Sequence, residues 1–266
     1  MDIKGQPFDY MQYIYSFVQK PIIRVCIRFN GQLQESKLRH AIKVLTSIYP
    51  ILLCRYNVQK RTWTENPNTS YEDLLTIIHA KNDFSTFKSN PLLESLEIGV
   101  DVPLRIYWIC GEKKDSLCII ASHIVCDGRG FEQILYLLAE FYSNIETRVQ
   151  INKDRSFSQV INGFTTLQKI KIICSKTQEH SNEKLHLPLT ESSQKPNLIT
   201  KQIDIHKLEQ YRSCIDEYRP SINDILLSAY MLTLHEMFKW DDIIIPCPVD
   251  LRRFNADASN SICNLT

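Results

Sequence analysis

The sequence predicts an α/β protein, in which a mixed and mostly antiparallel sheet is flanked by helices. Apolar residues alternate with polar ones over residues 21–30, which is the pattern of a strand. Over residues 34–49 the apolar residues recur every three or four positions, as they do in an amphipathic helix. Residues 117–142 pass from an apolar run through a polar loop into a second such helix. Strands and helices therefore alternate along the chain, as in layered α/β folds.

The beginning of the chain predicts a β-α-β-β arrangement. The strand at residues 21–30 is followed by the helix at 34–49, which ends before Pro50 because proline lacks a backbone donor. Residues 52–57 and 61–65 are predicted to be two short paired strands. Ahead of them, the aromatic-rich residues 8–15 are predicted to be an amphipathic packing helix, although they could instead line an acyl or acceptor pocket.

The middle of the chain predicts a short helix, a hairpin and a second long helix. Residues 71–80 are expected to form the short helix. Residues 104–110 and 117–122 are expected to be neighbouring strands, because the loop between them is polar and contains a glycine. The apolar residues between 131 and 142 lie on one face of a helix.

The remainder of the chain predicts an interdomain linker and part of a second subdomain. Residues 175–197 are polar and rich in Ser, Thr, Glu, Gln, Lys and Pro, and they are interpreted as the linker. It separates an N-terminal subdomain, residues 1–174, from the start of a C-terminal one, residues 198–266. The elements expected near it are a helix at 156–174, a strand at 198–203, helices at 206–218 and 222–238, and a strand at 242–249. The helix at 222–238 is apolar on most faces and is expected to be buried.

The composition excludes several classes of partner. The 31 Lys and Arg residues are balanced by 30 Asp and Glu residues, so the chain lacks the basic excess that nucleic-acid binding needs. Its apolar runs are shorter than the ~20 residues of a membrane span. Nine cysteines, an odd number mostly inside apolar runs, indicate reduced thiols and a cytoplasmic location.

One polar loop, residues 122–130, carries a lone histidine between an apolar strand and an amphipathic helix. A side chain at the end of a strand is held firmly and can still face a crevice. Imidazole exchanges a proton near neutral pH, so His123 is a candidate general base. The sequence contains no Gly-rich phosphate loop, no Gly-x-Ser-x-Gly and no Cys-x-x-Cys pair.

The residues alone leave the role of Asp127 open. Its carboxylate could orient the His123 imidazole, stabilise the protonated imidazole, or pair with an arginine. A purely structural interpretation also accounts for the loop. In that interpretation Asp127-Gly128 makes a turn, Asp127 caps the following helix, and His123 is a hydrogen-bonded histidine at the end of a strand.

Two further chemistries are considered and set aside. Cys126 lies close to His123 and could act as a nucleophile, but a cysteine in an Ile-Val-Cys run is more typical of core packing. Cys118, His123 and Cys126 are not expected to bind zinc, because strand alternation points them in different directions and no fourth ligand is evident. No metal is therefore expected.

The spacing of His123, Asp127 and Gly128 matches the His-x-x-x-Asp-Gly motif of the chloramphenicol-acetyltransferase-like superfamily, which the sequence resembles. This superfamily includes peptide-synthetase condensation domains, alcohol acetyltransferases and wax ester synthases. Further segments are similar in the same order, and together they span nearly the whole chain: Leu38-Arg39-His40-Ala41-Ile42, Pro50-Ile51-Leu52-Leu53-Cys54-Arg55, Pro248-Val249-Asp250-Leu251-Arg252 and Asn264.

The resemblance implies an enzyme that transfers an acyl group from a thioester to an alcohol or an amine. CoA or a carrier protein holds the thioester as a co-substrate, and no bound cofactor is implied. His123 is implied to be the base that removes the acceptor's proton, without a covalent acyl-enzyme. Asp127 is implied to be structural and paired with Arg252 or Arg55, of which Arg252 is preferred. Gly128 is implied to leave room at the mouth of the substrate tunnel.

Two departures from the family pattern shape the expectation. Position 122 is serine where condensation domains and wax ester synthases usually carry another histidine, which favours a stand-alone acyltransferase. Members of the superfamily have two pseudo-symmetric subdomains, and this sequence is expected to be truncated early in the second. The alternative function is therefore a non-catalytic, condensation-like binding module or inactive fragment, which holds a carrier protein or an acyl chain.

Overall fold

The computed structural model divides the chain into two compact units. One comprises Met1–Glu191 together with Val249–Thr266, and the other comprises Ser192–Pro248. The predicted linker at 175–197 lies outside the described residues, and the predicted subdomain boundaries stay a prediction. The described residues are 2–79, 91–144, 151–174, 201, 203–214, 219–240, 242–245 and 247–266.

The first unit contains two sheets. The larger sheet has the strand order β2-β7-β6-β5, and the smaller has the order β1-β4-β3. Every neighbouring pair is antiparallel except β5 and β6, which are parallel, so the predicted mixed and mostly antiparallel sheet is confirmed. The strands are β1 (Asp2–Lys4), β2 (Ile22–Arg28), β3 (Cys54–Asn57), β4 (Thr62–Glu65), β5 (Leu75–His79), β6 (Leu104–Cys110) and β7 (Ser116–Ser122).

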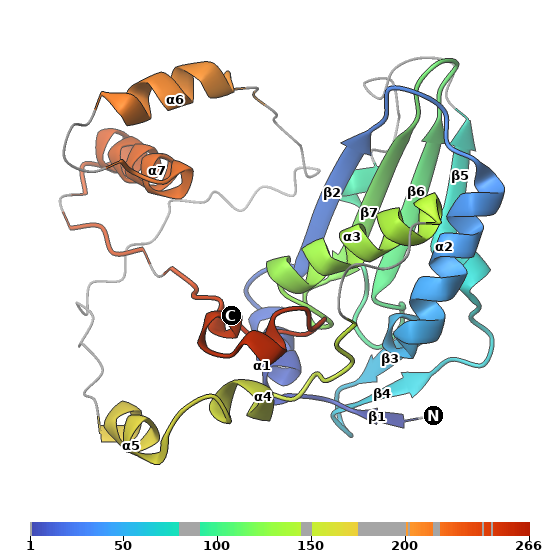
Figure 1. Cartoon of the computed structure of the whole chain (residues 1–266), viewed down its shortest axis with the longest axis horizontal. Coiled ribbons are helices and arrows are strands. Elements are labelled where there is room, and N and C mark those ends of the chain that lie inside the picture. The colour runs from blue at the N-terminus through green and yellow to red at the C-terminus, as the bar shows by residue number, and fades with distance from the viewer. Residues whose placement is uncertain are drawn as a thin grey trace. The chain divides into compact units, whose positions relative to one another are not determined.

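Two long helices, α2 (Glu35–Ile48) and α3 (Gly128–Ser143), cover one face of the larger sheet, as Figure 1 shows. Alternate strand residues separate into two clusters because successive side chains point to opposite faces. Ile106 and Ile119 belong to the main core that includes the helices, whereas Tyr107 and Ile120 belong to a smaller cluster. The sheet is thus buried on both faces where β7 leads into the loop with His123.

A short helix, α1 (Pro7–Tyr15), confirms the helix predicted over residues 8–15. The strand predicted at 21–30 and the helix predicted at 34–49 are also confirmed, as β2 and α2. The predicted hairpin is formed by β6 and β7, which pair from Leu104 opposite Ala121 onward.

The helix predicted at 71–80 is not formed by residues 71–79, the part of that range that the structure describes. One 3-10 turn, Tyr71–Leu74, leads into strand β5, which pairs with β6 from Leu75 opposite Ile106 to His79 opposite Cys110. Isoleucine and threonine residues dominate this strand, and β-branched side chains favour a pleated sheet. The sheet edge supplies hydrogen-bond partners that a local pattern cannot reveal.

The helix predicted at 156–174 is interrupted. It is split into α4 (Ser158–Ile161) and α5 (Thr166–Cys174), with Gly163 between them. A Cβ at Gly163 would lie 2.8 Å from the carbonyl oxygen of Phe254, so the chain needs glycine there. Glycine weakens a helix because it loses more conformational freedom than other residues on ordering.

The second unit contains helices α6 (Ile205–Ser213) and α7 (Ile222–Phe238). A capping box starts α7: Ser221 Oγ accepts from the Asp224 amide at 3.1 Å, and Asp224 Oδ2 accepts from the Ser221 amide at 2.7 Å. The predicted burial of this helix is wrong, because Leu234 is its one buried residue, whereas Leu232 is 63% exposed. A helix that is apolar on most faces needs neighbours on several sides, and the described part of this unit contains a single other helix, α6.

Two predicted strands are not seen in the described residues. Residues 242–245 and 247–249 form no strand, although their isoleucines fit the pattern, because they have no pairing partner in the described part of the chain. The strand predicted at 198–203 lies mostly outside the described residues, and residues 201 and 203 are not in a strand. Apolar β-branched runs become strands only where a sheet edge accepts their hydrogen bonds.

Candidate active site

The loop after β7 is fixed to the neighbouring chain at its first residue. The His123 amide donates to the carbonyl of Pro21 at 2.7 Å, next to the start of β2. The Ser122 amide donates to Pro103 at 2.8 Å. His123 itself is partly exposed, whereas residues 124–127 are buried. The imidazole is thus held at the end of a paired strand and is not fully enclosed by the protein.

Asp127 is buried and accepts four hydrogen bonds. It is the N-cap of α3, where its Oδ1 accepts from the Gly130 amide at 2.8 Å, and its Oδ2 accepts from the Leu265 amide at 2.7 Å. Arg252 donates to both carboxylate oxygens, at 2.9 and 3.0 Å. The side chains of Asp127 and Arg252 are 1% and 3% exposed. Breaking such a buried pair leaves an uncompensated charge, which costs about 3–5 kcal/mol.

Arg252 also binds the C-terminal segment of the chain. Its Nη2 donates to the carbonyls of Ser261 at 3.2 Å and Cys263 at 2.8 Å, and its Nη1 donates to Asp250 at 3.0 Å. Burial acts to lower the pKa of the Arg252 guanidinium, but the hydrogen bond and charge of Asp127 outweigh it, so the pKa is raised. The guanidinium therefore stays charged and joins the segment to the loop.

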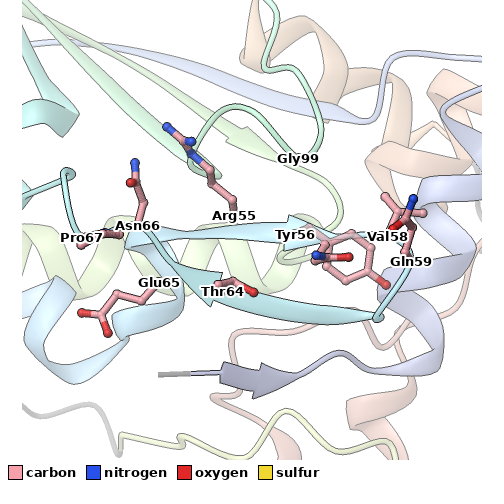
Figure 2. A pocket seen from close by; sticks show the side chains of 10 residues that line it. Arg55, Tyr56, Val58, Gln59, Thr64, Glu65, Asn66, Pro67 and Gly99 are labelled. Atoms are coloured by element: carbon pink, nitrogen blue, oxygen red, sulfur yellow. The ribbon is translucent and has the colours of Figure 1, made fainter.

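Arg55 makes no ion pair with Asp127 in the structure. Figure 2 shows Arg55 on β3, where it lines a separate cavity of about 450 Å³ that also includes Glu65 and Asn66. Of the two arginines considered from the sequence, Arg252 is thus the one in contact with Asp127.

Asn264 is the residue that the structure brings to the His123 ring. Its Oδ1 lies 3.3 Å from His123 Nδ1, and its Nδ2 donates to the carbonyl of Ile124 at 2.7 Å. Asn264 is 3% exposed, so its amide is held in this orientation by burial as well as by the Ile124 carbonyl. The assigned amide orientation implies that His123 donates through Nδ1, since the facing oxygen can only accept.

Two glycines follow the loop, and they differ in their surroundings. Adding a Cβ at Gly128 would meet no atom within 4 Å, whereas a Cβ at Gly130 would lie 2.9 Å from the Cβ of Cys126 and 3.2 Å from the backbone of Cys263. Gly130 therefore permits the close approach of α3 to the C-terminal segment. The role of Gly128 at a substrate tunnel stays a prediction.

Cys126 is fully buried, and burial raises the pKa of its thiol. A protonated, inaccessible thiol cannot serve as a nucleophile, which supports a packing role. Among the described residues, no three His, Cys, Asp or Glu side chains are grouped so that they could hold a metal ion. No described helix is long and apolar enough to cross a membrane.

Arg155 is a residue of the site that the sequence analysis missed. Its Nη2 forms hydrogen bonds to both carboxylate oxygens of Asp9, at 2.9 and 3.1 Å, and its Nη1 donates to the carbonyls of Val125 and Ile262, both at 2.6 Å. Asp9 is fully buried and also accepts from Trp63 Nε1 at 2.9 Å. A second buried pair thus supports the loop. The sequence signal for Arg155 was Asp9, a lone carboxylate in the aromatic helix α1, because a buried charge needs a partner of opposite charge.

These observations define an α/β protein with a histidine at the end of a strand and a buried Asp–Arg pair beside it. The sequence profile of the condensation domain family matches residues 19–262, and the chain belongs to that family. Condensation domains are acyltransferase-like enzymes, which form amide or ester bonds in nonribosomal peptide synthesis from thioesters held by carrier proteins.

Individual relatives are distant and larger than this chain. The FR901469 synthetase of Dothideomycetidae sp. (strain 11243) is 24% identical over 144 residues, which is 50% of this chain and 1% of that protein. The X-domain from teicoplanin biosynthesis is 14% identical, with a TM-score of 0.45 over 55% of this chain and 34% of that one. The first condensation domain of the CDA synthetase is 14% identical, with a TM-score of 0.45 over 61% of this chain and 46% of that one. The chain thus spans less than half the length of each.

Proposed function

We propose that this chain carries the general base of a condensation-type acyl transfer, in which an acyl group moves from a thioester to an amine or an alcohol. The contact between His123 Nδ1 and Asn264 Oδ1 at 3.3 Å is the observation that carries this proposal. If Nδ1 holds the ring proton, then Nε2 presents its lone pair and can accept a proton.

The proposed reaction needs one proton carrier and no covalent enzyme intermediate. Nε2 of His123 takes the proton from the acceptor's N–H or O–H as that atom attacks the thioester carbonyl. The new C–N or C–O bond forms, the C–S bond breaks, and the protonated imidazole returns the proton to the departing thiolate. Asp127 and Arg252 act by fixing the loop, and Asn264 acts by holding the tautomer. The thioester donor is proposed to be carried on CoA or a carrier protein.

The test is an acyl-transfer assay with acyl-CoA or an acylated carrier protein as donor and amines or alcohols as acceptors. The rate is measured from the release of free thiol. We expect His123→Ala to lower the rate by about 10²–10⁴-fold, the range typical of general-base catalysis. His40→Ala, on the exposed side of α2, is the control and should retain the rate. Circular dichroism should show that both variants keep the fold.

Unchanged turnover in His123→Ala would contradict the role of His123 as base. The alternative, a non-catalytic module, predicts a different result from the same protein. In that case the unmodified chain would bind an acylated carrier protein or acyl chain without turnover, and His123→Ala would bind it equally well.

A further inference from the structure

A second cavity in the first unit has a uniform charge. It has a volume of about 950 Å³ and lies where the end of β1, the start of α1, the β3–β4 turn and residues 156–158 meet. The charged side chains that line it are Lys4, Lys60 and Arg61, and no Asp or Glu lines it. We call it the basic pocket. A cleft lined by one sign of charge concentrates the electrostatic potential and attracts ligands of the opposite sign.

The three cations of the basic pocket are not neutralised by any carboxylate among the described residues. In the described part of the chain, none of Lys4, Lys60 and Arg61 forms an ion pair with a carboxylate. The other cavity differs in this respect, since Arg55 and Glu65 both line it. Nothing in the described lining of the basic pocket therefore competes with an incoming anion for these three side chains.

Arg61 is held in place from two sides. Its backbone has a φ of 52°, in the left-handed region, and its carbonyl accepts from the Gly5 amide at 2.9 Å. Gly5 has to be glycine for this contact, since a Cβ there would lie 2.6 Å from the same carbonyl oxygen. The guanidinium carbon lies 4.0 Å from the centroid of the Tyr10 ring. A guanidinium stacked on a ring keeps the donors along its edge free for a ligand.

We propose that the basic pocket binds the phosphate or diphosphate group of a small molecule. A diphosphate carries enough negative charge to engage all three cations, whereas a single carboxylate would leave part of the charge unmatched. Arg61 binds two of its oxygens through the edge of the guanidinium, and Lys4 and Lys60 act as point charges. The site is distinct from the proposed active site, because none of His123, Asn264, Asp127 and Arg252 lines it.

The test is calorimetric titration of the whole chain with inorganic pyrophosphate and, separately, with ADP, at low ionic strength. We expect saturable binding of pyrophosphate that weakens at least tenfold in Arg61→Gln and less in Arg61→Lys, which keeps the charge but not the fork of donors. Equal affinity for ADP identifies the diphosphate alone as the recognised group, and tighter binding of ADP identifies a diphosphate ester.

Two controls keep the result specific to the pocket. Arg39→Gln removes an arginine from the surface of α2, where it pairs with Glu35, and should bind pyrophosphate as the unmodified chain does. His123→Ala should also bind it unchanged. Absence of saturable pyrophosphate binding, equal affinities in Arg61→Gln and Arg39→Gln, or loss of binding in His123→Ala would each overturn the proposal.

Discussion

Two buried arginine–aspartate pairs hold the loop that carries His123, and they are built in opposite ways. In the first pair the loop itself supplies the carboxylate, Asp127, and Arg252 comes from far along the chain. In the second pair both charges lie outside the loop, where Arg155 binds the carboxylate of Asp9 and reaches the loop through a backbone carbonyl. The first pair therefore fixes the loop through its side chain, and the second fixes it through its main chain.

The two pairs also differ in how completely they are enclosed. The side chains of Asp127 and Arg252 are 1% and 3% exposed, and those of Asp9 and Arg155 are 0% and 9% exposed. A sequence motif can reveal Asp127, whose side chain makes the contacts, but it cannot reveal Arg155, which binds a main-chain carbonyl of the loop. Any residue at position 125 has a carbonyl that Arg155 could bind, so this contact does not require a particular residue type in the loop.

The largest expected effect is at the more enclosed pair. Replacing Arg252 by methionine leaves the Asp127 charge buried with two backbone donors, so we expect the free energy of unfolding to fall by about 3–5 kcal/mol. Urea denaturation measures the change. Arg253→Met is the control at the neighbouring exposed position and should change stability by less than about 0.5 kcal/mol. Similar losses in both variants would mean that Asp127 does not depend on Arg252.

The second pair should be less costly to break. Asp9→Asn removes the charge but keeps the shape, and Arg155 retains the carbonyls of Val125 and Ile262, so we expect a loss of about 2 kcal/mol. Asp2→Asn, at an exposed position on β1, should have almost no effect in the same denaturation experiment. A loss in Asp9→Asn that exceeds the loss in Arg252→Met would reverse the ranking of the two pairs.

The smallest expected effect concerns the packing between the pairs. Gly130→Ala places a Cβ 2.9 Å from the Cβ of Cys126 and 3.2 Å from the backbone of Cys263, so we expect a loss of about 1 kcal/mol, at the low end of the cost of overpacking. Gly128→Ala is the matched control, because its Cβ would meet no atom within 4 Å. Thermal denaturation of the two variants should separate them by several degrees. Equal melting temperatures would show that α3 can shift without cost.

The sequence predicted the elements with a long and regular pattern and missed those whose pattern is short or ambiguous. The alternation at 21–30 and the helical spacing at 34–49 each extend over a whole element, and both elements formed. Strand β5 was missed because its hydrogen bonds are made to β6, and the isoleucines at 243–245 form no strand because the described chain gives them no neighbour. A short apolar run therefore does not show by itself whether a sheet edge is available to it.

The candidate site shows the same division. The loop with His123 and Asp127 could be found from spacing and from its strand–loop–helix context. Arg155 could not be found in this way, because it follows Lys153 and Asp154 and looks like part of a solvated polar run. Its partner Asp9 lies 146 positions away, and a single sequence carries no measure of that distance in space.

Arg252 and Arg155 both bind main-chain carbonyls of the C-terminal segment, residues 261–263. Arg252 donates to the carbonyls of Ser261 and Cys263, and Arg155 donates to the carbonyl of Ile262 between them. Inserting or deleting one residue here would change which carbonyl meets each arginine and would move Asn264 away from His123. The length of the segment is therefore as important to the site as the identity of Asn264.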